Sequence, residues 1–94
     1  MRDITDKVAW ITGAGTGIGE GAAVALAEAG VKVVLSGRRQ DKLEEVARRC
    51  GPNASIEVLD VSNKEAVFEV AERIVQNHGK RPKKQWVKII NKKL

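Results

Sequence analysis

The part of the sequence best suited to chemistry is a glycine-rich segment, Thr12-Gly13-Ala14-Gly15-Thr16-Gly17-Ile18-Gly19. It lies between a short apolar run and a stretch whose apolar residues recur at helical spacing. Glycine lets a backbone turn tightly and approach a ligand closely, because it carries no Cβ. Free amides at the start of a helix, with the positive end of its dipole, bind phosphate groups. This setting favours pyrophosphate binding over a turn whose glycines serve packing alone.

Two arginines bear on which dinucleotide the segment would hold. NAD sites of this type carry an Asp or Glu about 20 residues beyond the glycines, which binds the ribose 2′-hydroxyl. Here Arg38 and Arg39 occupy that place, and no acid precedes Asp41. A carboxylate would repel a 2′-phosphate, whereas a guanidinium can pair with it through two hydrogen bonds. The sequence therefore favours NADP over NAD, although Arg39 is equally consistent with a solvated loop residue.

Residues that could act as a general base, a nucleophile or a metal ligand are scarce. The chain has one His, one Cys and no Tyr. His78 follows a helical stretch, where a solvated cap is favoured over catalysis, and Cys50 lies on an apolar helical face, as a small core residue does. No metal-ligand spacing occurs. We therefore expect no catalytic residue and no metal site in this chain, and a single cysteine favours a reducing, cytoplasmic location.

The elements that would position the glycine segment repeat one pattern three times: a short apolar run, a turn, then a helical period. The runs at 8–11, 33–35 and 56–59 are typical of strands buried on both faces of a parallel sheet. Gly30 and Gly51-Pro52 would end the first two helices. Alternation with connections this short predicts βαβ crossovers, hence an α/β fold with helices on the faces of a parallel sheet.

Apolar spacing also predicts which helical residues face the sheet. The expected faces are Ile18, Ala22, Ala25, Leu26 and Ala29 in the first helix, Leu43, Val46, Ala47 and Cys50 in the second, and Val67, Val70, Ala71 and Ile74 in the third. Ser62 with Glu65 predicts a capping box at the start of the third helix, since each could satisfy the other's free amide.

Charge is divided unevenly along the chain, whose overall net charge is +5. Residues 1–79 hold ten Lys and Arg against twelve Asp and Glu, a net charge of −2, whereas 80–94 hold seven cations and no acid. We therefore divide the chain into a dinucleotide-binding half-domain, 1–79, and a basic tail, 80–94. Within this tail, Trp86 to Ile90 fits either a short strand or one helical face.

The basic tail supports an alternative function, a non-catalytic interaction module that binds nucleic acid or an anionic surface. A solvated tail is favoured over that alternative, so nucleic acid is not expected as a partner. No apolar run approaches the roughly 20 residues that a membrane-spanning helix needs. The polar residues 1–6 carry both signs of charge and do not resemble a signal peptide.

The glycine segment resembles a known family. Thr12-Gly13-x-x-x-Gly17-x-Gly19 matches the TGxxxGxG signature of the short-chain dehydrogenase/reductase family, and Asp60-Val61 matches its adenine-contacting pair. The resemblance covers roughly residues 6–79. It implies a partial Rossmann-type, doubly wound parallel sheet of three βα units with a basic tail, in which Thr12 supports the glycine turn. The implied cofactor-binding residues are Gly13, Thr16, Gly17, Ile18 and Gly19 at the phosphates, Arg38 and Arg39 at the 2′-phosphate, and Asp60 and Val61 at the adenine.

The resemblance also implies an activity, hydride transfer between a nicotinamide cofactor and a carbonyl or alcohol. In the family a tyrosine in a YxxxK spacing is the general acid and base, a serine steadies the substrate oxygen, and an NNAG segment ends the fourth strand. This chain has no tyrosine, and its Asn91 is a poor match for that segment. We therefore expect the NAD(P)-binding portion of an oxidoreductase, truncated and inactive alone, whether from a shortened gene, an engineered fragment or a split protein.

The family strand order, 3-2-1-4-5-6, places the first strand at the centre of the sheet. With the later strands absent, residues 8–12 would form an exposed edge, which is a template for pairing with another chain. Either the tail or a second copy could cover this edge, so a homo-oligomer or a partner chain is one expectation.

Overall fold

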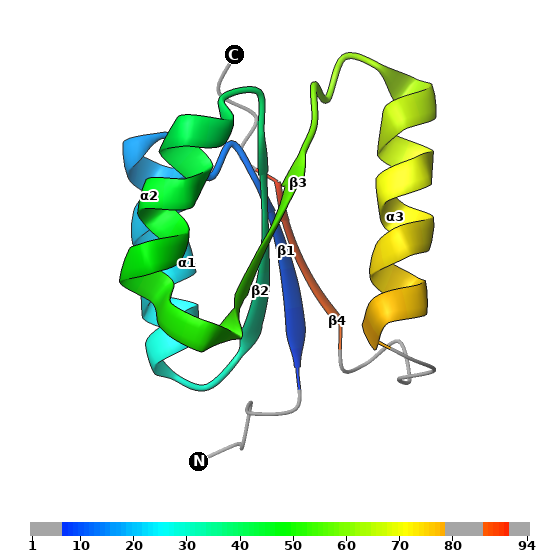
Figure 1. Ribbon diagram of the computed structural model, residues 1–94. Helices are drawn as coiled ribbons and strands as arrows, with labels where there is room; N and C mark the ends of the chain where they lie inside the picture. The colour runs from blue at the N-terminus through cyan, green and yellow to red at the C-terminus, as the bar shows by residue number, and fades with distance from the viewer. Residues whose placement is uncertain (1–6, 79–85, 91–94) are drawn as a thin grey trace.

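The computed structural model describes residues 7–78 and the backbone of 86–90. It is an α/β fold in which a parallel sheet of strand order β3-β2-β1-β4 carries α1 and α2 on one face and α3 on the other (Figure 1). The elements are β1 (Val8–Thr12), α1 (Gly17–Glu28), β2 (Lys32–Gly37), α2 (Gln40–Cys50), a 3₁₀ turn η1 (Gly51–Asn53), β3 (Ala54–Val58), α3 (Lys64–His78) and β4 (Trp86–Ile90). The expected α/β fold with a parallel sheet is confirmed.

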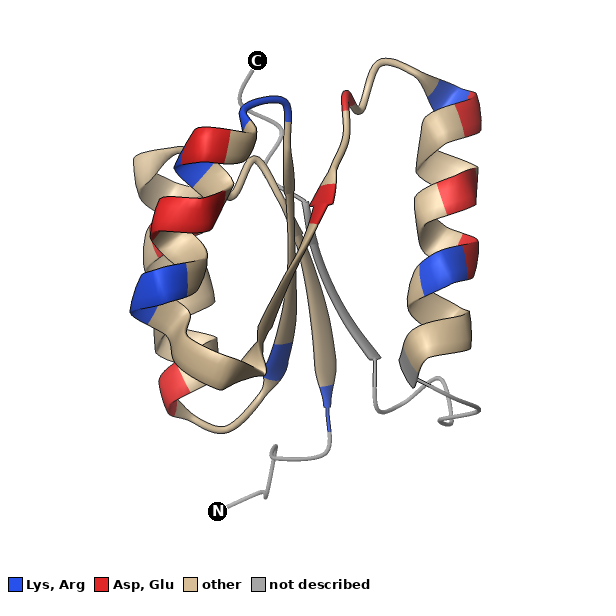
Figure 2. Ribbon diagram, in the orientation of Figure 1, with Lys and Arg blue, Asp and Glu red and all other residues tan. Residues whose placement is uncertain are grey.

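Two apolar clusters fill the spaces between the sheet and its helices. Side chains of β1 and β2 alternate between the two clusters, as the period of a strand requires. Charged residues lie on the helices, just before β1, at the start of β2, on β3 and in the loops after β2 and β3, whereas the centres of β1 and β2 are uncharged (Figure 2). Ala9, Ile11, Val33 and Leu35 pack against α1 and α2, whereas Val8, Trp10 and Val34 pack with Leu59, Val70 and Ile74 on the α3 side.

The buried face of α1 differs from the expected one. Ile18 is 72% exposed, and the residues buried against the sheet are Gly19, Ala23 and Ala27. These three recur every four residues and are among the smallest side chains in the helix. Small residues let the helix axis approach the sheet closely, and this geometry takes precedence over burying the larger Ile18. The predicted faces of α2 and α3 are confirmed at Leu43, Val46, Val70 and Ile74.

The start of α3 also differs from the prediction by one residue. The N-cap role falls to Asn63, whose Oδ1 accepts a hydrogen bond of 3.1 Å from the amide of Ala66. Ser62 instead donates its hydroxyl to the Asp60 carboxylate at 2.7 Å. The expected capping box of Ser62 and Glu65 is therefore wrong, because α3 begins at Lys64 and its N-cap is Asn63 instead of Ser62.

A strand of the basic tail completes the sheet. β4 runs parallel to β1, with Val8 opposite Trp86 and Thr12 opposite Ile90. This pairing decides between the strand and the helix that the sequence left open, and of the two expected covers for the edge of β1 it is the tail that pairs with it. Residues 80–85 and 91–94, Asn91 included, lie outside the described residues. In the part of the chain that the structure describes, no helix has the length and apolar character needed to cross a membrane.

Candidate functional site

The glycine turn after β1 is held by hydrogen bonds of its own backbone. Gly13 has a φ of 68°, a conformation that favours glycine. Its carbonyl oxygen accepts from the amide of Thr16 at 3.1 Å and from the Thr16 hydroxyl at 2.8 Å. The amide of Ala14 donates to the carbonyl of Ser36 at 3.0 Å, which ties the turn to the end of β2. The turn is therefore fixed in place at the carboxyl end of two strands.

The glycines of the segment serve different purposes. A β-carbon at Gly19 would lie 2.3 Å from the carbonyl oxygen of Gly13, so this position admits only glycine without a shift of backbone. A β-carbon at Gly17 would meet nothing within 4 Å. Gly19 therefore allows α1 to begin directly against the turn, whereas Gly17 leaves an open space beside the first amides of α1, where a phosphate group could enter.

An open cleft of about 530 Å³ lies at the carboxyl ends of β1, β2 and β3, within the size range of small-molecule sites. This is the place where ligands bind in open parallel sheets of this kind. Its lining combines the glycine turn, the residues after β2, the first turn of α2 and the loop after β3. The lining residues are Gly13, Gly15, Thr16, Gly37, Arg38, Arg39, Lys42, Leu43, Leu59, Asp60, Val61 and Ser62.

Six of the nine residues expected at a cofactor line this cleft: Gly13, Thr16, Arg38, Arg39, Asp60 and Val61. The other three, Gly17, Ile18 and Gly19, form the first turn of α1 and do not line it. Sequence reasoning did not single out Lys42, because it enters the cleft through the approach of α2 to Gly15, which no local pattern reports. The roles of the nine expected residues in binding a cofactor remain predictions.

The loop after β3 holds a carboxylate in a defined orientation. Oδ1 of Asp60 accepts from the amide of Ser62 at 3.0 Å and from its hydroxyl at 2.7 Å. These two bonds, first the backbone one, lower the pKa of Asp60, and the positive charge of Arg38 adds to the effect, while partial desolvation opposes it. The carboxylate is therefore ionised at neutral pH, with its second oxygen left for another donor.

The two neighbouring arginines are in different situations. Nη2 of Arg39 lies 3.1 Å from Oδ2 of Asp41 in an exposed ion pair. Arg38 forms no ion pair with any of the residues that the structure describes. Desolvation acts to raise the pKa of Asp41, but hydrogen bonds from the Lys42 backbone and from Arg39 together outweigh it and lower this pKa. Asp41 does not line the cleft. Arg38 is thus the arginine available to a ligand.

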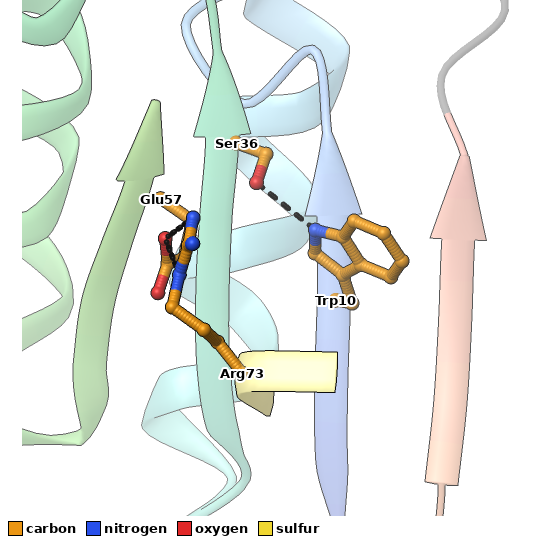
Figure 3. Close-up of polar contacts among 4 residues, drawn as sticks. All are labelled: Trp10, Ser36, Glu57 and Arg73. Atoms are coloured by element: carbon orange, nitrogen blue, oxygen red, sulfur yellow. Dashed lines mark hydrogen bonds and ion pairs between the residues drawn. The ribbon is translucent and has the colours of Figure 1, made fainter. Parts of the chain in front are cut away.

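Polar contacts elsewhere brace the elements around the cleft (Figure 3). Nε1 of Trp10 donates to the hydroxyl of Ser36 at 2.9 Å in the core, joining β1 to β2. The Arg73 guanidinium on α3 binds Oε1 of Glu57 on β3 through two hydrogen bonds of 2.9 and 3.1 Å. These contacts support the fold and lie outside the lining of the cleft.

Candidates for proton transfer or nucleophilic attack are few. Burial raises the pKa of the half-buried Cys50 thiol, and the nearby Arg49 only partly offsets this, so the reactive thiolate is disfavoured. The side chain of His78 lies outside the described residues. Within residues 7–78 and 86–90, no group of three His, Cys, Asp or Glu could hold a metal ion.

Comparison with known proteins agrees with this geometry. The sequence model described as short chain dehydrogenase matches residues 7–81. The chain is 48% identical over 81 residues to a protein of Staphylococcus aureus strain N315 named as an uncharacterized oxidoreductase, covering 84% of this chain and 35% of that protein. It is 46% identical over 83 residues to a protein of the same description in Staphylococcus saprophyticus, covering 84% and 36%. The chain therefore spans about a third of the length of these relatives.

Solved structures give the same result. The crystal structure of an NAD⁺-bound xylitol dehydrogenase has a TM-score of 0.78 and 32% identity, covering 84% of this chain and 32% of that one. A 3-ketoacyl-(acyl-carrier-protein) reductase from Brucella melitensis, crystallised with NADH, has a TM-score of 0.73 and 40% identity, covering 79% and 31%. With a glycine turn, a cleft at the carboxyl ends of the strands and a family match over most of its length, the chain belongs to the short-chain dehydrogenase family of oxidoreductases.

Proposed function

We propose that this chain binds NADP(H) through the adenosine end of the cofactor and is the cofactor-binding portion of an oxidoreductase that transfers hydride between NADP(H) and a carbonyl or alcohol. The observation that carries the proposal is the cleft, which brings the glycine turn, Arg38 and Asp60 together at the ends of three strands. When bound, the nicotinamide would accept or donate the hydride. The chain's own residues would hold and orient the rest of the cofactor.

The residues present fit such a cofactor. The open space at Gly17, beside the first amides of α1, suits the pyrophosphate, since these amides and the helix dipole favour negative charge. The Asp60 carboxylate, with one oxygen occupied by Ser62, can accept a hydrogen bond from the adenine amino group on the other oxygen. The half-exposed Val61 offers an apolar contact for the adenine ring.

The preference for NADP over NAD rests on charge. Arg38 lines the cleft and forms no ion pair with a described carboxylate, although its positive charge helps to lower the pKa of Asp60. The acid nearest to it in sequence, Asp41, is paired with Arg39 outside the lining. A guanidinium in this position can bind a 2′-phosphate through two hydrogen bonds. Nucleic-acid binding by the basic tail is not proposed, because the proposal rests on the cleft alone. A cytoplasmic location, suggested by the single cysteine, is part of the same proposal.

Calorimetric titration with NADPH and NADH tests cofactor binding, using two variants with the same chemical change. Gly17→Asp and Gly21→Asp both place a carboxylate on α1 at positions where a β-carbon meets nothing within 4 Å. Only Gly17 lies at the expected phosphate position, so Gly17→Asp should abolish binding while Gly21→Asp retains it. The proposal fails if the unmodified chain binds neither cofactor at millimolar concentration, or if the two variants bind alike.

Arg38→Asp tests the choice between the two cofactors. The new carboxylate would repel the 2′-phosphate and could accept a hydrogen bond from a 2′-hydroxyl. Loss of a charge-assisted contact costs about 1.5–3 kcal/mol, which corresponds to roughly one to two decades in affinity for NADPH. The affinity for NADH should hold or improve. Equal weakening toward both cofactors would mean that Arg38 supports the fold and not the phosphate.

A further inference from the structure

Among the described residues, three cations line the cleft: Arg38, Arg39 and Lys42. We propose that Lys42 and Arg38 together bind the 2′-phosphate of NADP(H), and that Arg39 is not part of this site. The inference rests on the proposed function and deepens it, because it names a specificity-determining lysine that the glycine-loop pattern does not contain.

Arg39 is already engaged by its neighbour. Its Nη2 atom lies 3.1 Å from Oδ2 of Asp41, and the two side chains are 68% and 67% exposed. The pair as a unit carries no net charge. A phosphate approaching Arg39 would have to displace or approach this carboxylate, which repels it. Arg39 therefore adds little to the recognition of an anion, even though it lines the same cleft.

Lys42 is placed against the glycine turn. A β-carbon at Gly15 would lie 3.1 Å from Cβ of Lys42, so the base of the lysine side chain packs directly on the turn that precedes α1. Both residues line the cleft. Because Gly15 has no side chain, the first turn of α2 can approach the glycine turn closely, and this approach brings the lysine into the lining of the cleft that Arg38 also lines.

The charges at this rim match a phosphate monoester. Neither Arg38 nor Lys42 forms an ion pair with any residue in the described ranges. A phosphate monoester carries a charge of about −1.5 to −2 at neutral pH, more than one cation neutralises. A guanidinium contributes a planar fork with two parallel hydrogen bonds, and an ammonium contributes a compact charge whose donors can rotate to a third oxygen. A 2′-hydroxyl offers no charge to either residue.

The test compares the affinities for two ligands, one with a 2′-phosphate and one with a 2′-hydroxyl. The full chain is titrated with adenosine 2′,5′-bisphosphate and with adenosine 5′-monophosphate, which differ only in the 2′-phosphate. Lys42→Gln should weaken binding of the bisphosphate roughly tenfold, the lower end for loss of a charge-assisted contact at an exposed site, and leave the monophosphate unchanged. Arg39→Gln is the matched control, and it should change neither affinity by more than about twofold. Lys42→Arg should restore most of the preference.

Each contrary result has a distinct meaning. If Lys42→Gln weakens both ligands equally, the lysine acts on the 5′-phosphate or on the turn, and the inference is wrong. The same conclusion follows if Lys42→Gln has no effect, or if Arg39→Gln reduces the preference as much as Lys42→Gln does. If the unmodified chain binds neither ligand, the proposed function itself fails. If it binds both equally, the preference for NADP fails, and this inference with it.

Discussion

The indole Nε1–H of Trp10 donates a hydrogen bond of 2.9 Å to the hydroxyl of Ser36 in the core of the sheet (Figure 3). Ser36 has no exposed surface, and its carbonyl oxygen accepts from the amide of Ala14 at 3.0 Å. One residue of β2 thus joins β1 through its side chain and the glycine turn through its backbone. The position of the cleft depends on this connection, because both strands end at its rim.

Ser36→Ala should lower the free energy of unfolding by about 1–3 kcal/mol, since it takes a hydrogen-bond acceptor away from a buried donor. Ser55→Ala is the matched control, because Ser55 is an exposed serine on the neighbouring strand β3. Denaturant unfolding measures both variants. Equal destabilisation by the two substitutions would show that the bond between Trp10 and Ser36 contributes nothing beyond the loss of a hydroxyl.

Two glycines of α1 should respond in opposite directions to the same substitution. Gly19→Ala would place a β-carbon 2.3 Å from the carbonyl oxygen of Gly13, and should destabilise the fold by about 1–3 kcal/mol because backbone must shift. Gly21→Ala meets nothing within 4 Å and should stabilise the helix by roughly 0.5–1 kcal/mol. Thermal unfolding of the two variants measures the difference. A stabilising Gly19→Ala would overturn the close approach of α1 to the turn.

The carboxylate of Asp60 should give stability a pH dependence of known sign. The bonds from the amide and hydroxyl of Ser62 lower the pKa of Asp60 in the folded chain. Its contribution to stability is therefore fully present above the unfolded value of about 3.9, and is lost as the pH falls through the lower, folded value. The difference in unfolding free energy between the unmodified chain and Asp60→Asn should shrink as the solution is acidified through this window.

Ser62→Ala supplies the control for this prediction. It removes the side-chain hydrogen bond and leaves the backbone one, so the pKa of Asp60 should rise but stay below its ordinary value. Titration of the Asp60 carboxyl by nuclear magnetic resonance measures this directly. An unchanged pKa in Ser62→Ala would mean that the hydroxyl bond does not contribute.

The sequence predicted the features of this fold that depend on local patterns. Continuous apolar runs identified β1 and β2, because strands covered on both faces carry no polar side in their sequence. Gly51, with a φ of 84°, ends α2 where the Gly-Pro pair indicated. The glycine segment was placed correctly between a strand and a helix. In each case neighbouring residues contain the information.

The features that were missed depend on three-dimensional neighbours. Ile18 was expected in the core by spacing, yet the small residues around Gly19 let α1 pack without it. The tail segment Trp86–Ile90 could have been a helix or a strand until its pairing with β1, far away in the sequence, decided the matter. Lys42 enters the cleft because α2 approaches the glycine turn at Gly15, a contact between a helix and a turn that periodicity does not report.

Deletion of residues 80–94 should do more than remove positive charge. It would remove β4 and leave β1, all five residues of which are buried, as an unpaired edge of the sheet. Exposed apolar edges pair with other chains. The shortened chain should therefore be less stable and self-associate, as measured by sedimentation. A chain that stays monomeric and equally stable without these residues would show that β4 does not support the sheet.

The 94-residue chain alone should bind its cofactor without turning it over. Hydride transfer to a carbonyl needs a proton delivered to the substrate oxygen, and general acid and base catalysis contributes about 10²–10⁴-fold to such a step. The chain has no tyrosine, the residue that the family resemblance implies for this task. Positioning of substrate and nicotinamide in a closed pocket contributes a further large factor. The described residues that line the cleft belong to the first three βα units, and we expect them to contact the adenosine and the phosphates and not to orient the nicotinamide.

Absorbance of NADPH during incubation with ketones, aldehydes and quinones measures this turnover, with Gly17→Asp as the variant that blocks the phosphate position. We expect that neither the unmodified chain nor Gly17→Asp oxidises NADPH faster than it is oxidised in buffer alone. Oxidation that the unmodified chain supports and Gly17→Asp abolishes would contradict the prediction. It would require an acid elsewhere in the chain to protonate the substrate oxygen, and the described carboxylates offer a poor source, since Asp60, the one in the cleft, has a lowered pKa and is ionised at neutral pH. Because the Asp60 carboxylate is ionised, it can accept a hydrogen bond from an adenine amino group, but it has no proton to deliver to a substrate oxygen.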